Sequence, residues 1–150
     1  MIRAAAVALA PMVLVACATG PARPSTPART RAGDWLAMTW EERHDVMTFA
    51  VLPNMARAFQ RFRGSVAPDL TCRTCHGPDA EAVAYRMPHG LSALDPSRLP
   101  ARDDGDPNVA RTVRFMQDEV TPAMADLLGV PLARPGEPLG FSCFHCHPSR

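Results

Sequence analysis

The sequence predicts an all-α fold made of two tandem repeats, each a helix and a turn followed by the motif C-x-x-C-H. Three observations predict this fold. The motif occurs twice, apolar residues recur at helical spacing before each copy, and no stretch keeps the period-two alternation of a strand. The repeats cover about residues 39–77 and 106–148 of the 150 residues, and we expect little or no sheet.

The start of the chain predicts an export signal. Its first 16 residues, MIRAAAVALAPMVLVA, hold one Arg and an apolar stretch that is too short to span a bilayer as a helix. The stretch runs into LVAC and ends at Cys17, which resembles the lipobox of bacterial lipoproteins. This resemblance implies a lipidated Cys17 and an exported protein anchored to a bacterial membrane, on its periplasmic side or at the cell surface. Cleavage of a plain signal peptide nearby is the alternative.

The next segment has the composition of a linker. Residues 18–33, ATGPARPSTPARTRAG, lack the apolar side chains that a core needs, so residues 17–33 are predicted to form a lipidated tether. The folded domain is then residues 34–150. The chain has 16 Arg and 15 Asp plus Glu residues, and no basic stripe, which argues against nucleic acid as a partner.

The two copies of C-x-x-C-H belong to a longer internal repeat. The pattern Met-x-x-x-Val-x-Pro-x-Met-Ala occurs at residues 47–56 and again at residues 116–125, an offset of 69. The cysteine motifs follow at an offset of 71, so an insertion of two residues separates the halves. A repeat of this kind predicts that one structural unit occurs twice.

Both repeats carry the signals of helix ends. The first helix is predicted to begin at the capping-box sequence Thr39-Trp-Glu-Glu, and the second at Asp106, which is followed by Pro. Gly64 and Gly129 are the predicted stops. The predicted core-facing residues are Trp40, Met47, Val51, Met55, Phe59 and Phe62 in the first helix, and Val109, Val113, Met116, Val120, Met124 and Leu128 in the second.

A proline lies inside each predicted helix, Pro53 in the first and Pro122 in the second. Proline lacks an N–H donor and clashes with the carbonyl four residues back, so it kinks or breaks a helix. One interpretation is a bend in both halves that leaves room for a cofactor. The other is two short helices in each half, with the proline at the start of the second.

The motifs CRTCH, residues 72–76, and CFHCH, residues 143–147, are the attachment signature of c-type haem. Two cysteines three residues apart each form a thioether with one haem vinyl group, and the adjacent histidine ligates the iron. The sequence therefore predicts two covalently attached haems. The attachment residues and proximal ligands are Cys72, Cys75, His76, Cys143, Cys146 and His147.

Two other readings of the cysteines stay open. Pairs of C-x-x-C also build four-cysteine zinc sites, although zinc does not require a histidine directly after each pair. Outside the cytoplasm the pairs could also oxidise to disulfides. Export favours haem, because c-type cytochromes are assembled outside the cytoplasm.

The sixth ligand of each iron decides between closed and open coordination. The repeat supplies Met55 and Met124 as equivalent candidates, and Met47 and Met116 as alternatives eight residues earlier. Met87, in the sequence Met-Pro-His, is a further alternative. A Met/His pair raises the reduction potential and suits electron transfer.

A helix bearing Met, a turn and then C-x-x-C-H resembles the haem-binding unit of the tetrahaem cytochrome subunit of photosynthetic reaction centres. NMARAF followed by LTCRTCHG, and MADLLGV followed by GFSCFHCHP, carry the likeness. In that family the sixth ligand of most haems is a methionine on the preceding helix, which the resemblance places at Met55 and Met124. This chain departs from the family in having two units rather than four, and in the insert VPLARPGEP.

The expected function is electron transfer by a membrane-anchored periplasmic dihaem cytochrome c, which exchanges single electrons with a donor and an acceptor protein. On this reading the protein is a carrier and not an enzyme. The alternative is a small dihaem enzyme or sensor with one open iron, which reduces peroxide or binds nitric oxide or carbon monoxide.

Overall fold

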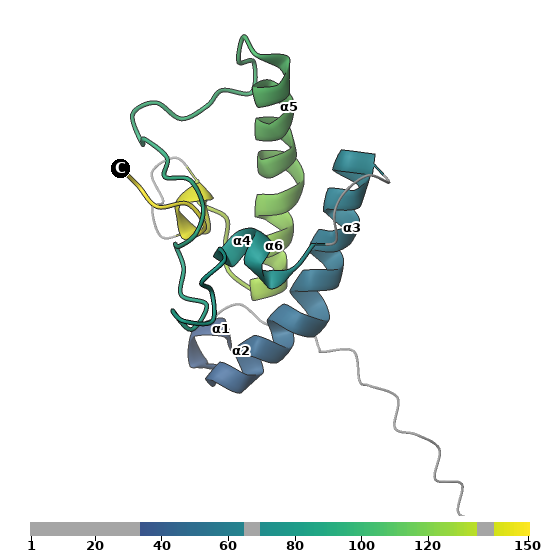
Figure 1. Ribbon diagram of the computed structural model, residues 1–150, viewed down its shortest axis with the longest axis vertical. Helices are drawn as coiled ribbons and strands as arrows, with labels where there is room; N and C mark the ends of the chain where they lie inside the picture. The colour runs from purple at the N-terminus through teal and green to yellow at the C-terminus, as the bar shows by residue number, and fades with distance from the viewer. Residues whose placement is uncertain (1–33, 65–69, 135–139) are drawn as a thin grey trace, which may run out of the picture.

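The computed structural model describes residues 34–64, 70–134 and 140–150 (Figure 1). Within these ranges it contains helices and two isolated β-bridges but no sheet, so the all-α prediction is confirmed at this level. The helical elements are α1 (Asp34–Ala37), α2 (Trp40–Val46), η1 (Met47–Val51), α3 (Leu52–Arg63), α4 (Cys72–His76), α5 (Pro107–Phe115), η3 (Met116–Val120), α6 (Thr121–Leu128) and η4 (Cys143–His145).

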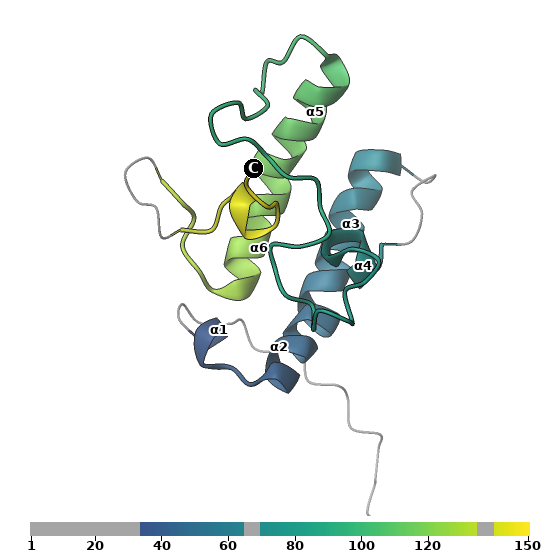
Figure 2. The same ribbon diagram turned by 60° about the vertical axis from the view of Figure 1, so that its left-hand side comes forward.

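Most of these elements join into two helical rods. The first rod is α2, η1 and α3, and the second rod is α5, η3 and α6. The contacts between the rods are reciprocal, because α3 packs against η3 while α6 packs against η1. Figures 1 and 2 show the rods side by side and inclined to each other. This is the arrangement expected when two copies of one unit pack together.

The ends of both rods lie at the residues that the sequence predicts. The N–H of Glu42 donates to Oγ1 of Thr39 at 3.2 Å, and the N–H of Thr39 donates to the Glu42 carboxylate at 2.7 Å. Asp106 accepts a hydrogen bond from the backbone of its own helix at 2.8 Å. Gly64 and Gly129 follow α3 and α6 as C-caps. Gly129 has φ 64°, the left-handed conformation that glycine adopts without a steric penalty.

A π-helical turn precedes the proline in each rod. The N–H of Leu52 donates to the carbonyl of Met47, and the N–H of Thr121 donates to the carbonyl of Met116, so both bonds span five residues. Pro53 and Pro122 then lie near the start of the α-helix that follows. The second interpretation of the prolines is therefore nearly right, but the two helical pieces are joined by a π-turn and not by a break.

The π-turn also shifts the buried face of each rod, which corrects the predicted stripes. Val46 and Val51 are both buried and lie five residues apart, and buried Phe115 stands five residues before half-buried Val120. A plain α-helix repeats its faces every three or four residues, but a π-turn adds one. Because α-helical spacing was carried through the prolines, the sequence did not predict that Val46 and Phe115 are buried.

The core consists of two clusters. The central cluster is formed by the buried residues Val46, Val51, Met55, Ala125, Leu128 and Phe141. The aromatic cluster is formed by Ala58, Phe59 and Phe115, with Phe62 packed against it. The ring of Phe115 stacks on Phe62 at 4.1 Å and meets the edge of Phe59 at 5.0 Å. Each cluster contains residues of both rods, so neither rod buries its apolar face alone.

Val109 and Val113 are half-buried and pack against neither cluster, and the most exposed of the predicted core residues is Trp40. It is 55 % exposed and stacks on His44 at 5.2 Å. Trp35 of α1 packs against the central cluster instead. Arg43 holds α1 in place by donating from Nε to the carbonyl of Trp35 at 3.1 Å. The short helix α1, which the sequence did not predict, thus covers this end of the first rod.

The signal peptide, Cys17 and the tether were predicted for residues 1–33, which lie outside the described residues. Among the helices of the described ranges, none has the length and apolar character needed to cross a membrane.

Candidate functional site

The first motif forms the helix α4, which starts directly after Thr71. The N–H of Thr71 donates to Oγ1 of Thr74 at 3.1 Å, and the N–H of Thr74 donates to the carbonyl of Thr71 at 3.0 Å. This local bonding winds the motif into a single turn. Cys72 and Cys75, which are three residues apart, therefore project from the same side of the helix.

The imidazole of His76 lies against Tyr85. The two rings meet edge to face, with centroids 5.5 Å apart and planes at 83°. Burial lowers the pKa of His76, and the backbone of Tyr85 partly opposes this shift. The Nδ1 atom of His76 is buried and makes no hydrogen bond of normal geometry with the described residues. At neutral pH the imidazole is therefore uncharged, which is the form that ligates a metal.

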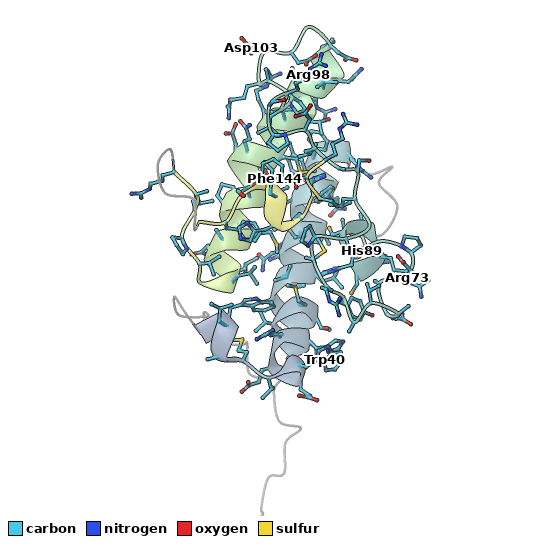
Figure 3. The ribbon with its side chains drawn as sticks, turned by 90° about the vertical axis from the view of Figure 1, so that its left-hand side faces the viewer. Trp40, Arg73, His89, Arg98, Asp103 and Phe144 are labelled. Carbon is cyan, nitrogen blue, oxygen red and sulfur yellow. The ribbon has the colours of Figure 1, made fainter. Side chains whose placement is uncertain are left out.

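The second motif forms a 3₁₀ turn, η4, with a related cap. The N–H of Ser142 donates to Nδ1 of His145 at 3.1 Å, which matches the bond from Thr71 to Thr74 at the motif offset of 71. His145 is exposed and stacks on Phe141 at 4.9 Å. Figure 3 shows Phe144 of this turn beside the second rod.

His147, the last residue of the second motif, has a defined tautomer. Its Nδ1 atom lies 2.9 Å from the carbonyl oxygen of Ser92, which can only accept a hydrogen bond. Nδ1 must then carry the proton, and the lone pair of Nε2 is free. A metal-ligating histidine is usually oriented in this way, by donating its other ring N–H to a carbonyl or carboxylate.

The four motif cysteines are all thiols in this structure. Burial, and to a lesser extent the neighbouring Cys72, raises the pKa of Cys75. Burial raises the pKa of Cys146 to about 11, with smaller contributions from Cys75 and Cys143. Cys146 packs against the central cluster, as does Leu70, two residues before the first motif, so the two motifs approach each other there. The described part of the chain holds no group of three or more His, Cys, Asp or Glu placed to bind a metal.

The π-turns align the candidate methionines. Eight residues separate Met47 from Met55 and Met116 from Met124. In an α-helix eight residues leave two side chains about 80° apart, whereas one extra residue in the turn reduces this to about 20°. Met55 belongs to the central cluster, and Met47 packs against it. Met124 also packs against the central cluster, whereas Met116 packs against the aromatic cluster.

A cavity of about 270 Å³ opens beside the second motif. Cys143 lines it from the motif, and Gln117 and Thr121 line it from the second rod. Thr121 and Met124 are three residues apart in α6 and share a face. Met124 is therefore better placed for the second motif than Met116, which lies farther along the rod and packs against the aromatic cluster.

Met55 is placed differently. It is only 4 % exposed, and it lines a cavity of about 280 Å³ between α3 and α6 together with Arg57 and Arg61. The central cluster that contains Met55 also includes Leu70, just before the first motif, and Cys146 of the second motif. The structure thus places Met55 near both motifs, so its position alone does not assign it to the first motif.

Met87 is half-buried and packs against neither cluster. The next histidine, His89, has Nε2 3.0 Å from Oδ1 of Asp79, and this bond holds the pKa of Asp79 below its usual value. The bond occupies a ring nitrogen that a metal would otherwise use. Figure 3 shows His89 and Arg73 on the side of the molecule that carries α4.

Three features of the site were not predicted from the sequence. Side chains at the third motif position, Thr74 and His145, accept a hydrogen bond from the backbone of the residue before each first cysteine, and a polar side chain at both positions was the available signal. Tyr85 packs on His76, and as the only tyrosine of the chain it offered a weak signal. Ser92 acts through its carbonyl, for which a sequence carries no signal.

These donor sets fit a c-type haem at each motif. Each has two thiols on one turn and a histidine. The imidazole of His76 is uncharged, and Nε2 of His147 is free. Comparison with protein-family models, curated proteins and solved structures finds no match to this chain.

Proposed function

We propose that this chain is a dihaem c-type cytochrome that is anchored to a bacterial membrane by a lipid and carries single electrons between partner proteins. The observation that carries the proposal is the pair of C-x-x-C-H turns, each with two thiols, together with the bond from His147 to the carbonyl of Ser92. That bond leaves Nε2 directed away from the chain's own acceptor and available to iron.

The thiols are suited to covalent attachment. Each adds its S–H across a vinyl group, so one C–S and one C–H bond form and no oxidant is needed. The raised pKa values of Cys75 and Cys146 keep both groups as thiols at neutral pH. His76 would then hold the haem of the first motif, and His147 that of the second. Haem supplies one-electron redox chemistry when bound, and the chain sets its position and surroundings.

The sixth ligands follow from the faces of the two rods. We assign Met124 to the second site because it shares a face with Thr121, which lines the cavity at Cys143. By the repeat, Met55 is the ligand of the first site, with Met47 as the alternative on the same face. A Met/His pair closes the iron to external ligands, which favours electron transfer over gas binding or peroxide reduction.

We expect the two sites to lie close enough for electrons to pass between them. Leu70, just before the first motif, and Cys146 of the second motif pack against the same central cluster. Two haems bound through these cysteines would be adjacent. A donor protein would then reduce one haem and an acceptor would oxidise the other.

The experiment that tests the proposal is the visible spectrum of the dithionite-reduced protein before and after addition of carbon monoxide, with haem counted per chain. We expect two haems and no spectral change with carbon monoxide. The matched variants are C72S/C75S and C143S/C146S, and each should retain one haem.

Each other outcome has a definite meaning. A chain that is exported and matured with no covalent haem would refute the proposal. A shift in about half of the haem would mean that one iron is open, and the enzyme or sensor would replace the carrier. Extraction of the wild-type protein, but not of C17S, into a detergent phase tests the lipid anchor separately.

A further inference from the structure

The segment that connects the two motifs touches both proximal histidines. Near its start, the ring of Tyr85 packs edge to face on His76, with centroids 5.5 Å apart. Near its end, the carbonyl of Ser92 accepts the hydrogen bond from Nδ1 of His147 at 2.9 Å. Residues 77–95, which we call the connecting segment, follow the first repeat in sequence and yet contact the histidine of the second motif.

The end of the connecting segment is paired with the C-terminus of the chain. The N–H of Leu94 donates to the carbonyl of Pro148 at 2.8 Å, and the N–H of Arg150 donates to the carbonyl of Leu94 at 3.1 Å. Leu94 and Ser149 form a parallel β-bridge. These bonds begin one residue after His147, so they hold its backbone while Ser92 holds its ring.

The start and end of the connecting segment meet at a close backbone contact. A Cβ at Gly90 would lie 2.5 Å from Cα of Gly77 and 2.6 Å from the carbonyl oxygen of His76. Both glycines have positive φ, 85° and 78°. The pair of His89 and Asp79, 3.0 Å apart, braces the same crossing. Because Ser92 follows Gly90 by two residues, its position is tied to that of His76.

We propose that the connecting segment positions the proximal histidines of both haem sites, and that the carbonyl of Ser92 sets the reduction potential of the second haem. This inference rests on the function proposed above. A hydrogen bond from Nδ1 makes the imidazole a stronger donor, which favours ferric over ferrous iron and lowers the potential. His76 makes no hydrogen bond of normal geometry with the described residues, and only the weaker influence of the Tyr85 backbone reaches its ring, so we expect the second haem to have the lower potential.

The test is a spectroelectrochemical titration of the haem-loaded full chain and its L94P variant. Proline at position 94 removes the N–H that binds Pro148 and touches neither motif. We expect the variant to bind two haems and to keep one reduction potential unchanged. The other potential should rise by about 59 mV, which for one electron corresponds to a tenfold higher ratio of ferrous to ferric iron. The matched control is L99P, because Leu99 is exposed and its N–H has no partner among the described residues.

A second variant tests the same inference if L94P does not fold. G90A opens the crossing at Gly77 and should raise the same potential, whereas G105A places its Cβ in open space and should change nothing. Repeating L94P in C72S/C75S and in C143S/C146S assigns the shift, which should occur only when the second haem is present.

Three outcomes would overturn the inference. L94P and G90A could both retain two haems with unchanged potentials, L94P could move both potentials equally, or the shift caused by L94P could occur in the chain that holds only the first haem. A wild-type chain with no haem would refute the proposed function itself, so the two failures are distinguishable.

Discussion

The helical halves of the two repeats follow one plan, whereas their cysteine motifs are held in two different ways. Both rods contain a π-turn at equivalent positions, Met47–Val51 and Met116–Val120, and a proline two residues later. The first motif is an α-helical turn with His76 beside Tyr85, and the second is a 3₁₀ turn with His147 bonded to Ser92.

The difference shows which parts of a repeat are set locally. A π-turn before a proline depends on residues within the same helix, so duplication copies it. The surroundings of the histidine that ends each motif depend on the chain that follows the motif. After the first motif that chain is the connecting segment, and after the second it is residues 148–150, which pair with Leu94. Two copies of one unit can thus give two sites with different properties.

The largest effect should come from removing a sixth ligand. M124A should open one iron of the loaded protein, so that carbon monoxide shifts the spectrum of half of the haem where the wild type shows no change. M55A should open the other iron. M55A should also lower the free energy of unfolding by about 2 to 5 kcal/mol, because Met55 is buried in the central cluster. M124A should cost less, because Met124 is half-buried.

The alternatives M47A and M116A are the matched controls for this comparison, since each lies on the same rod eight residues earlier. We expect neither to open an iron. If M116A binds carbon monoxide and M124A does not, the assignment from the cavity at Cys143 is wrong, and the repeats differ in their ligands as well as in their motifs.

The second effect concerns one position that both rods bury with different side chains. Val46 packs in the central cluster and its repeat equivalent Phe115 in the aromatic cluster. F115A should lower the free energy of unfolding by about 3 to 5 kcal/mol and V46A by about 2 kcal/mol, measured by denaturant titration. F49A should change it by less than about 0.5 kcal/mol, because Phe49 is 63 % exposed. Equal costs for F49A and F115A would contradict the buried register that the π-turn creates.

The third effect distinguishes the cysteines before haem attachment. With a pKa of about 11, Cys146 has roughly one thiolate per thousand molecules at pH 8, whereas a free cysteine has about a quarter. Alkylation of Cys146 in the unloaded chain should therefore be about two hundredfold slower than that of a model thiol, and its rate should rise tenfold per pH unit up to about pH 11. Mass spectrometry of peptides after timed alkylation measures this. A rate that levels off near pH 9 would mean that Cys146 is not buried.

Much of the fold could be predicted because its signals are local. The cap at Thr39, the start at Asp106 and the stops at Gly64 and Gly129 each depend on a few adjacent residues. The buried face before each proline could not be predicted, because the π-turn changes the spacing from four residues to five.

The same contrast holds at the candidate site. The thiols and histidines of the motifs are evident from their spacing. The bond from His147 to Ser92 joins residues 55 positions apart through a backbone carbonyl, and no residue type marks such an acceptor. The sequence therefore predicts that the site occurs twice, but it does not predict that the two copies differ.

The smallest effect tests whether the two motif turns are stabilised alike. T74A removes the side-chain acceptor of the Thr71 N–H, and H145A removes that of the Ser142 N–H. Both bonds are exposed, so each variant should lower the free energy of unfolding at neutral pH by only about 0.5 to 1 kcal/mol. Denaturant titrations of both variants and the wild type at neutral pH make the comparison. If H145A costs clearly more than T74A, His145 stabilises the second turn through its packing on Phe141 as well as through the bond to Ser142.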